Sequence, residues 1–302
     1  MARLLAVDAN SLTHRGFHSV LRQVPDVNHV DVNEVTHAVA NMLVATWRYG
    51  PYDHLLLAFD HPHNARREMF PEYKGQRAPT PGPVKDALEA VRAIFAEADV
   101  PVLREDGAEA DDLLAAVVDI TENAELATDV LSSDRDLIAL VDTHTRLLRP
   151  QASFSTLRIE TPDSVRTRYG IEPWQYPDLA ALRGDPADGL DGVRGIGEKT
   201  ATQLLQRYDT VLGVYDNLEV LSPRIEAALR RDREQVERNL ILMAPRTRLN
   251  VAVDTVLAEP FSLTRLIDTL SKHGFDDTAR RFRRVHAESQ APPKAPHPEY
   301  PA

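Results

Sequence analysis

The sequence of 302 residues contains no cysteine. This absence excludes disulfide bonds, thiolate zinc sites and cysteine nucleophiles, and it is typical of proteins from a reducing compartment. Long hydrophobic runs are missing too, because no apolar stretch approaches the roughly 20 residues of a membrane-spanning helix. The opening MARLLAVDAN becomes acidic too early for a signal peptide. We therefore expect a soluble cytoplasmic protein.

Basic residues are in the minority, with 35 Lys and Arg against 46 Asp and Glu and a formal net charge of −11. Taken alone, this balance argues against a nucleic acid as the partner. The acids of a metal centre count in that sum, however, and nucleic-acid binding depends on local basic patches. Basic side chains gather at 66–85, 194–207 and 280–284. The composition is therefore compatible with a nucleic-acid partner.

Apolar residues, 43% of the chain, are sufficient for one large or two modest domains. Their spacing alternates between short buried runs and helical repeats, which is typical of βαβ units with a parallel sheet. We expect strands at 4–7, 54–59, 100–103, 129–132 and 145–148, and helices at 11–22, 32–49, 83–98 and 109–123. From about residue 160 the pattern is helical. The predicted fold class is α/β, with a mostly parallel central sheet flanked by helices.

Carboxylates cluster where these strands end or helices begin, and the carboxyl ends of parallel strands share one edge of a sheet. The nine acids concerned are Asp8, Asp60, Glu109, Asp111, Asp112, Asp134, Asp136, Asp185 and Asp188. Two like charges about 4 Å apart repel by roughly 4 kcal/mol at an effective dielectric near 20, so such a cluster needs cations or raised pKa values. Single acids could be helix caps, but the repeated pattern favours metal binding. Oxygen ligands alone suit Mg²⁺ or Mn²⁺.

A glycine-rich segment, DGVRGIGEKTATQLL, spans residues 191–205. Glycines at 195 and 197 before a helix allow backbone amides to approach a phosphate, and Lys199 adds a positive charge. A dinucleotide fingerprint is the weaker alternative, because G-x-G-x-x-G is not matched and no strand precedes the segment. A purely structural tight turn remains a second alternative.

The segment YKGQRAPTP, residues 73–81, combines an aromatic ring with cations. A solvated basic loop is the ordinary explanation for such a segment. Because it follows Asp60, it is also a candidate to hold a single nucleic-acid strand by stacking and charge. His14, His18, His61 and His63 show no ligand spacing, and we expect them to be ordinary polar residues.

Several motifs occur together and in order: VDANSLTHR, AFD, RREMFPEYKGQRAPTP, EADD, SSDRD and RGDPADGLDGVRGIGEKTA. With them the chain resembles the 5′-nuclease family, the flap endonucleases and 5′-3′ exonucleases that include the amino-terminal domain of bacterial DNA polymerase I. The resemblance implies a PIN-like core over 1–160 with a helical arch at about 61–83. It also implies a helical DNA-binding subdomain over 161–286, with a helix-three-turn-helix at about 184–208. The Pro-rich residues 287–302 are expected to form a flexible tail.

The resemblance also assigns roles to the clustered acids and to the basic segments. The first metal would be held by Asp8, Asp60, Glu109 and Asp111, the second by Asp134, Asp136, Asp185 and Asp188, with Asp112 between them. DNA contacts would come from Arg15, Arg66, Tyr73, Lys74, Arg77, Gly195, Gly197 and Lys199. Arg15 and Lys74 would offset charge on the reacting phosphate. The loop from Gly192 to Gly197 would grip duplex DNA and could hold K⁺.

The function implied is hydrolysis of DNA at 5′ flaps, nicks or single-strand/duplex junctions by two or more divalent cations. Such an enzyme would act in replication and repair beside a DNA polymerase and a ligase. Three departures from the polymerase-linked pattern, at Ala9, Gly189 and Asp191, indicate a free-standing paralogue. Two alternatives stay open: a phosphatase with an aspartate nucleophile in SSDRD, and a DNA-binding repair module without catalysis.

Overall fold

The computed structural model describes residues 2–151, 156–246, 249 and 260–290. At its centre lies a six-stranded sheet in the order β3-β2-β1-β4-β5-β6. The strands are β1 (Arg3–Asp8), β2 (His54–Ala58), β3 (Val102–Leu103), β4 (Ala127–Leu131), β5 (Thr145–Pro150) and β6 (Leu157–Glu160). All neighbouring pairs are parallel except β5 with β6. The predicted fold class is therefore confirmed, although the edge strand β6 was not expected.

Strand β1 lies between β2 and β4, where the strand order changes direction. Its residues Leu4 to Val7 are fully buried, as a central parallel strand covered on both faces requires. In an open α/β sheet, ligands bind beyond the carboxyl ends of the strands at such a switch point. The residues that follow β1 and β4 therefore lie where a ligand is expected to bind.

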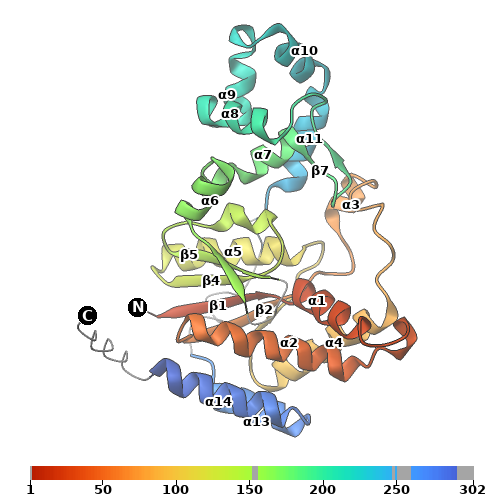
Figure 1. Cartoon of the computed structure of the whole chain (residues 1–302), viewed down its shortest axis with the longest axis vertical. Coiled ribbons are helices and arrows are strands. Elements are labelled where there is room, and N and C mark those ends of the chain that lie inside the picture. Colours follow the sequence, from red (N-terminus) through yellow and green to blue (C-terminus); the bar gives the residue numbers. More distant parts are fainter. Residues whose placement is uncertain (1, 152–155, 247–248, 250–259, 291–302) are drawn as a thin grey trace, which may run out of the picture.

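Helices cover both faces of the sheet (Figure 1). On one face, Leu5 and Val7 pack with α1 (Ala9–Leu21), α2 (Val32–Thr46) and α4 (Gly82–Glu97). On the other face, Leu4 and Ala6 pack with α5 (Ala110–Asn123), α6 (Pro162–Tyr169) and α7 (Tyr176–Arg183). This alternation follows from the period of two in a strand. Short 3₁₀ helices lie at Val27–His29, Trp47–Tyr49, Asp136–Leu140, Pro173–Gln175 and Leu218–Val220.

A helical unit rises above α7 (Figure 1). It contains a two-stranded hairpin, β7 (Gly184–Asp185) and β8 (Leu190–Asp191), followed by α8 (Glu198–Tyr208), α9 (Val211–Asp216), α10 (Pro223–Arg231) and α11 (Arg233–Met243). The hairpin was not expected in a segment whose pattern is helical. It places Asp185 and Asp188 in a hairpin rather than on a helix.

The chain then returns to the α/β core. Helices α13 (Leu263–Lys272) and α14 (Asp276–Gln290) lie beneath α2 and α4, opposite the helical unit (Figure 1). The rings of Trp47 and Phe282 are 5.4 Å apart, and Thr278 donates a hydrogen bond to Asn41. The range 161–286 therefore contains two groups of helices, and only the first lies above the sheet. Of the predicted tail, residues 287–290 continue α14, and 291–302 lie outside the described residues.

The segment between β2 and α4, predicted to be a helical arch, contains little helix. Its helix is α3 (Ala65–Met69), which is capped by Asn64, whose side chain accepts hydrogen bonds from the amides of Arg66 and Arg67. Turns follow up to Gln76, and Pro79 and Pro81 lead into α4. Proline and glycine in this segment explain why helix does not continue. Within the described residues, no helix is both long and apolar enough to cross a membrane.

Candidate metal centre

An open cavity of about 1810 Å³ lies at the carboxyl edge of the sheet. Eight of the nine predicted acids line it: Asp8, Asp60, Glu109, Asp111, Asp134, Asp136, Asp185 and Asp188. Arg15, Lys74 and Arg77 line the same cavity. Residues separated by up to 180 positions in the chain are thus brought together by the parallel sheet and the β7–β8 hairpin.

The acids after β1 and β2 are fixed by local hydrogen bonds. Asp8 ends β1 and caps α1, accepting from the amide of Ser11 at 2.8 Å and from the Ser132 hydroxyl at 2.6 Å. Asp60 follows β2 and accepts from the amide of Ala110 at 2.8 Å. These contacts join the end of β1 to the end of β4, and the end of β2 to the start of α5.

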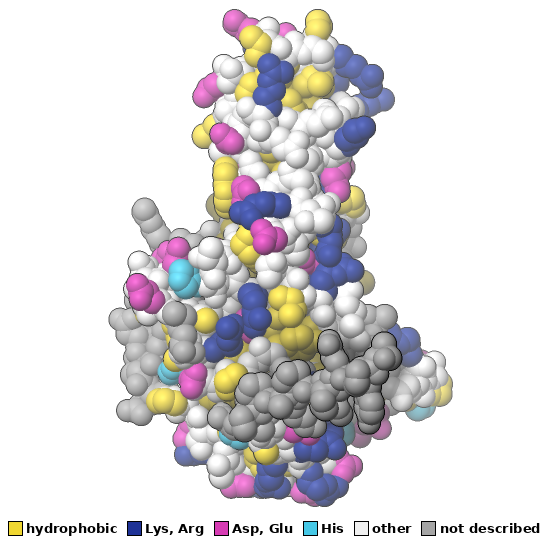
Figure 2. Space-filling model, turned by 60° about the vertical axis from the view of Figure 1, so that its left-hand side comes forward, with side chains coloured by type: hydrophobic (Ala, Val, Ile, Leu, Met, Phe, Trp, Pro, Cys, Tyr) yellow, Lys and Arg dark blue, Asp and Glu magenta, His cyan; other side chains and the backbone are white. Residues whose placement is uncertain are grey.

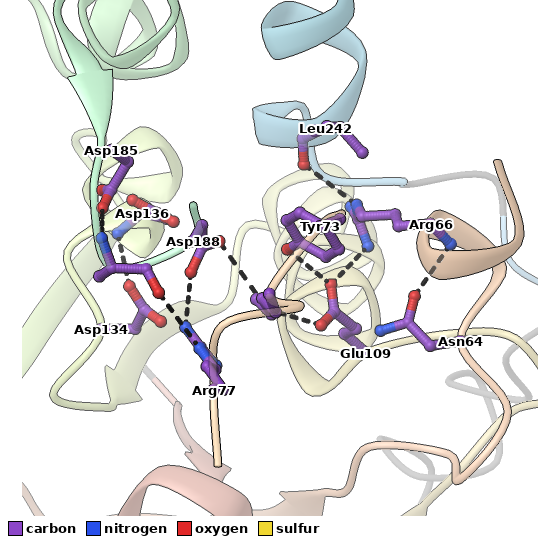
Figure 3. Close-up of polar contacts among 12 residues, drawn as sticks. Asn64, Arg66, Tyr73, Arg77, Glu109, Asp134, Asp136, Asp185, Asp188 and Leu242 are labelled. Carbon is purple, nitrogen blue, oxygen red and sulfur yellow. Dashed lines mark hydrogen bonds and ion pairs between the residues drawn. The ribbon is translucent and has the colours of Figure 1, made fainter. Parts of the chain in front are cut away.

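The acids of the second group come from a loop and a hairpin. Asp134 follows β4 and accepts from the amide of Asp136 at 3.0 Å. Asp185, in the hairpin, accepts from the amide of Ala187 at 2.8 Å. In Figure 3, Asp134, Asp136, Asp185 and Asp188 lie on one side of the view, with the hairpin bringing the last two toward the loop after β4. The side-chain donor atoms of these acids are all oxygens, a donor set that fits hard divalent cations.

Burial and crowding disfavour the ionised form of several of these acids. Burial, with the charge of Asp60, raises the pKa of Asp8 to about 7. Burial, together with Asp134, raises the pKa of Asp111 and of Asp136 well above the usual range. Burial also raises the pKa of Asp60. A bound cation favours ionised carboxylates. A cation among these buried acids would therefore offset both their burial and their mutual repulsion.

Glu109 has a different environment, because cations of the segment before α4 surround it (Figure 3). It accepts from Lys74 at 2.6 Å, from Arg66 at 3.0 Å and from the Tyr73 hydroxyl at 3.1 Å. Burial alone would raise the pKa of Glu109, but Lys74, Arg66 and Tyr73 together outweigh burial and lower that pKa. Asp188 likewise pairs with Arg77 at 2.5 Å. Two predicted metal ligands are therefore in contact with predicted DNA-binding cations.

Asp112, the ninth acid, does not face the cavity. It is fully buried and holds Arg66 through two bonds of 2.7 and 2.6 Å. It also accepts from the amides of Glu109 and Arg246. The Arg66 guanidinium in turn donates to the carbonyl of Leu242 at 3.1 Å. The pair therefore joins α5, α3 and the end of α11, and its oxygens are already engaged by donors.

Two predicted DNA contacts are also buried. Arg66 is 3% exposed and Tyr73 is 4% exposed. A ring with so little exposed surface has no free face for stacking with a base. The structure thus leaves Arg15, Lys74 and Arg77 as the predicted basic residues beside the cavity.

The glycine segment lies between α7 and α8 and does not line the cavity, although Gly197 shares a small neighbouring hollow with Asp185. Gly195 has φ +96°, a conformation that favours glycine. A Cβ at Gly192 would lie 2.1 Å from the backbone carbon of Arg183, so this position serves the tight turn itself. Gly197 precedes α8, and a Cβ there would meet nothing within 4 Å. Lys199 is exposed in the first turn of α8.

On the face drawn in Figure 2, the basic side chains of the helical unit do not form one continuous surface. Figure 2 shows Lys and Arg on the upper part of the drawn face, interspersed with acidic side chains. Several pairs contribute to this mixture, such as Arg230 with Glu226 and Arg233 with Glu237. Contacts to a polyanion would therefore depend on local positions such as Lys199 and the amides before α8.

Some residues around the centre were not anticipated. Asn10 accepts from the amide of Asp60 at 3.0 Å, and the Ser11 hydroxyl accepts from the amide of Ser133 at 3.0 Å. Both follow directly after β1, in the same short motif as Asp8, which was the signal available in the sequence. The histidines taken as ordinary include His61 and His63, which lie beside Asp106.

Comparison with known proteins shows the family to which the chain belongs. A family model described as the 5′-3′ exonuclease N-terminal resolvase-like domain matches residues 3–170, and one described as its C-terminal SAM fold matches residues 171–263. The chain belongs to the 5′-3′ exonuclease family. This membership covers both the sheet with its acids and the helical unit.

Relatives of this 5′-3′ exonuclease family member include longer proteins. DNA polymerase I of Mycobacterium tuberculosis is 32% identical over 273 residues, which is 88% of this chain and 30% of the polymerase. The chain thus spans about a third of the length of the polymerases that it matches. The 5′-3′ exonuclease of Mycoplasma pneumoniae is 27% identical over 94% of this chain and 100% of its own length.

A solved structure has the same fold over nearly the whole chain. The flap endonuclease of bacteriophage T5, in a complex with DNA and metal ions, aligns with a TM-score of 0.64 at 20% identity. The alignment covers 94% of this chain and 99% of the phage protein. The similarity includes the α/β core and the helices above it.

Proposed function

We propose that this chain is a structure-specific nuclease that hydrolyses DNA at 5′ flaps, nicks or single-strand/duplex junctions. The observation that carries the proposal is the convergence of eight carboxylates on one cavity at the switch point of the sheet. Membership of the 5′-3′ exonuclease family supports it, as does the DNA and metal bound to the T5 flap endonuclease. A phosphatase with a single aspartate nucleophile leaves Asp185 and Asp188 without a role.

The cations that we propose are two or more Mg²⁺ or Mn²⁺ ions. When bound, divalent cations in such a site supply an activated water and neutralise the leaving oxygen. Asp8, Asp60, Glu109 and Asp111 would hold one position, and Asp134, Asp136, Asp185 and Asp188 the other. The raised pKa of Asp8 means that loading these positions at neutral pH releases protons.

The basic residues beside the cavity would place the scissile phosphate. Lys74 is fixed between Glu109, at 2.6 Å, and Asp188, at 3.9 Å, so its ammonium group lies over the acids. Arg77 is half-exposed on the same segment, and Arg15 lines the cavity from α1. These three cations would bind and orient the phosphate and balance the charge that develops on it.

We also propose that the two parts of the molecule divide the substrate between them. A free 5′ strand would pass under the segment 61–83, toward the acids, while the amides before α8 and Lys199 would bind the duplex backbone. Two carbonyls that a K⁺ ion at 192–197 could use already accept hydrogen bonds from side chains. The carbonyl of Gly192 accepts from Gln235, and that of Arg194 accepts from Arg231. Cleavage would leave a nick that a ligase can seal. The enzyme would therefore act beside a DNA polymerase and a ligase in replication and repair.

The proposal is tested with a flap substrate labelled at its 5′ end. We expect cleavage near the junction with Mg²⁺ or Mn²⁺ and none in excess chelator. A streptavidin block on the 5′ end, added before the enzyme, should slow cleavage, whereas the same block on a 3′ flap should not. Cleavage of 3′ flaps at the same rate would refute the 5′ polarity. A covalent phosphoaspartate during turnover would instead identify the phosphatase.

A further inference from the structure

A second group of metal-binding side chains lies at the outer base of the segment 61–83. It consists of His61, His63 and Asp106, whose ligand atoms all lie within 4.8 Å of one another. Among the described residues, this is the group of three potential ligands that packs most tightly into one point. None of the nine predicted acids belongs to it.

The distances match those of a coordination shell. The Nδ1 of His61 lies 3.1 Å from Asp106 Oδ1, and the Nδ1 of His63 lies 2.9 Å from the same oxygen. Ligands at about 2.05 Å from a tetrahedral Zn²⁺ are separated by about 3.3 Å. Two of the three separations therefore need a change of only a few tenths of an ångström to enclose an ion.

Hydrogen bonds around the group orient the two imidazoles. The Nε2 of His63 lies 2.9 Å from Glu68, so a proton on that nitrogen leaves Nδ1 with its lone pair toward Asp106. The backbone amide of His63 donates to the Nδ1 of His61 at 3.2 Å, so that nitrogen carries no proton, and its lone pair would turn from the amide to a bound ion. A metal-binding histidine whose other N–H is held by a carboxylate is the common arrangement at zinc sites.

The position of the group gives an ion there a structural role. His61 donates its amide to the carbonyl of Ala108 at 3.0 Å, and Asn64 forms a bridge with Gly107. An ion at this point would fasten the loop after β2 to the loop before α5. Asp60 and Glu109 extend from these two loops into the cavity, so the fastening would limit the movement of both acids.

We propose that His61, His63 and Asp106 form a binding site for one borderline divalent cation, with Zn²⁺ as the preferred ion. Nitrogen donors separate this site from the all-oxygen centre, because imidazole suits Zn²⁺ whereas carboxylates alone suit Mg²⁺ and Mn²⁺. Water would complete the shell, and Glu68 would hold His63 in place. The site does not depend on nuclease activity.

The competing explanation is an ion pair without metal. If His63 is protonated on both nitrogens, it can donate to Asp106 and Glu68 together, and the three charges are then satisfied. This arrangement leaves no lone pair on His63 for a cation. The two explanations therefore give opposite results in a metal-binding measurement.

The test is a Zn²⁺ titration of the metal-free full chain in excess Mg²⁺, which competes with Zn²⁺ for the oxygen centre, by calorimetry and by metal analysis after dialysis. We expect the wild type to bind one equivalent of Zn²⁺ more than His63→Gln and Asp106→Asn at the same free Zn²⁺ concentration. The variants His63→Gln and Asp106→Asn should each bind Zn²⁺ at least about tenfold more weakly. The matched control is His29→Gln, since His29 contacts Asp26 but belongs to no group of three ligands, and it should bind as the wild type does.

Cobalt gives a second readout that identifies the ligands. Co²⁺ in a nitrogen-containing site of low coordination number absorbs visible light much more strongly than Co²⁺ among six oxygens. We expect that band in the wild type and in His29→Gln, and its loss in His63→Gln and Asp106→Asn. Unfolding temperatures without metal establish that each variant is folded. Absence of Zn²⁺ binding by the wild type, or equal binding by all variants, would overturn the proposal.

Discussion

Two sets of carboxylates share the cavity, and they differ in what surrounds them. Glu109 and Asp188 contact cations of the segment 61–83, so the charges are balanced by the protein itself. The other six, here called the open acids, have no Lys or Arg at ion-pair distance among the described residues: Asp8, Asp60, Asp111, Asp134, Asp136 and Asp185. The comparison teaches that clustering alone does not define a metal ligand, since the charge balance of each acid differs.

The contrast is sharpest between adjacent residues. Asp111 lines the cavity and has a pKa raised well above its usual range by burial and by Asp134. Asp112, its neighbour, is directed into the protein and paired with Arg66. One residue further along a helix turns a side chain by about 100°, so two acids with the same sequence signal have different tasks.

The largest expected effect concerns the open acids. The variant Asp136→Asn should reduce cleavage of a 5′ flap by roughly 10³-fold or more, because a lost ligand removes electrostatic stabilisation of the transition state. The metal-free variant should be at least as stable as the wild type, since one charge leaves a repelling cluster. Single-turnover cleavage and thermal unfolding measure both. A variant with normal cleavage would remove Asp136 from the centre.

The second effect concerns Asp112, the buried acid that is paired with Arg66. The variant Arg66→Ala should lower the free energy of unfolding by about 3–5 kcal/mol, because it leaves Asp112 buried without its partner. The matched control is Arg67→Ala, because Arg67 is adjacent in sequence but exposed, and this variant should change stability by less than about 0.5 kcal/mol. Urea unfolding of both variants decides the matter. Equal losses would mean that the buried pair has no special importance.

Much of this division follows from features that a sequence does not contain. The strand-then-acid pattern was sufficient to predict that Asp8, Asp60 and Asp134 converge, because parallel strands share an edge. It could not predict that Arg66 and Tyr73 are buried. Their partners, such as Leu242 at the end of α11, lie far away in the chain.

The same limit applies to the fold. The period of apolar residues predicted β1, β2, β4 and the helices between them. The two-residue strands β7 and β8 carry no period of their own, and β6 is a short edge strand with a charged surface. The return of α13 and α14 to the core depends on contacts such as Trp47 with Phe282, which no local pattern reveals.

The third effect is a pH dependence of stability. The pKa of Asp8 is about 7 in the folded protein against 3.8 as the reference value. Between about pH 4 and pH 7 the folded chain therefore keeps a proton that the unfolded chain releases, so stability falls as pH rises, by at most about 1.4 kcal/mol per pH unit. Below pH 4 both states are protonated and the contribution of Asp8 is constant.

The variant Asp8→Asn isolates this contribution. Asparagine keeps the cap of α1 but cannot ionise, so the loss of stability between pH 4 and pH 7 should be smaller in the variant than in the wild type. Saturating Mn²⁺ should also reduce the loss in the wild type, because a bound cation favours the ionised form. Urea unfolding at several pH values, without metal, measures the difference. Identical slopes would contradict the raised pKa.

The fourth effect tests whether the cation beside Glu109 acts on the phosphate. The variant Lys74→Ala should slow the chemical step by roughly 10- to 100-fold while changing duplex affinity little, because its contact would be made as the phosphate reaches the acids. The matched control is Lys85→Ala, an exposed lysine at the rim of the same cavity. Lys74→Arg should restore part of the rate. A change in affinity alone would make Lys74 a binding residue.

The smallest effect lies outside both sets of acids, at the loop before α8. Gly197 has φ −92°, which any residue adopts, and a Cβ there would meet nothing within 4 Å. The variant Gly197→Val should therefore fold normally and leave the acids unchanged, yet obstruct the approach of a phosphate to the amides of α8. We expect duplex affinity to fall by about tenfold, or about 1.4 kcal/mol, with the single-turnover rate at saturating enzyme unaffected.

The neighbouring glycine provides the contrast that makes this result informative. Gly195 has φ +96°, so Gly195→Val strains the backbone and should lower the unfolding temperature as well as the affinity. Binding to duplex DNA, measured by fluorescence anisotropy over a range of salt concentrations, should weaken with salt for every variant, because phosphate contacts release counterions. If Gly197→Val binds as tightly as the wild type at low salt, the duplex does not contact this loop. The acids and the segment 61–83 would then account for substrate binding. The proposal that the loop before α8 binds the duplex while the cavity carries out cleavage would be wrong.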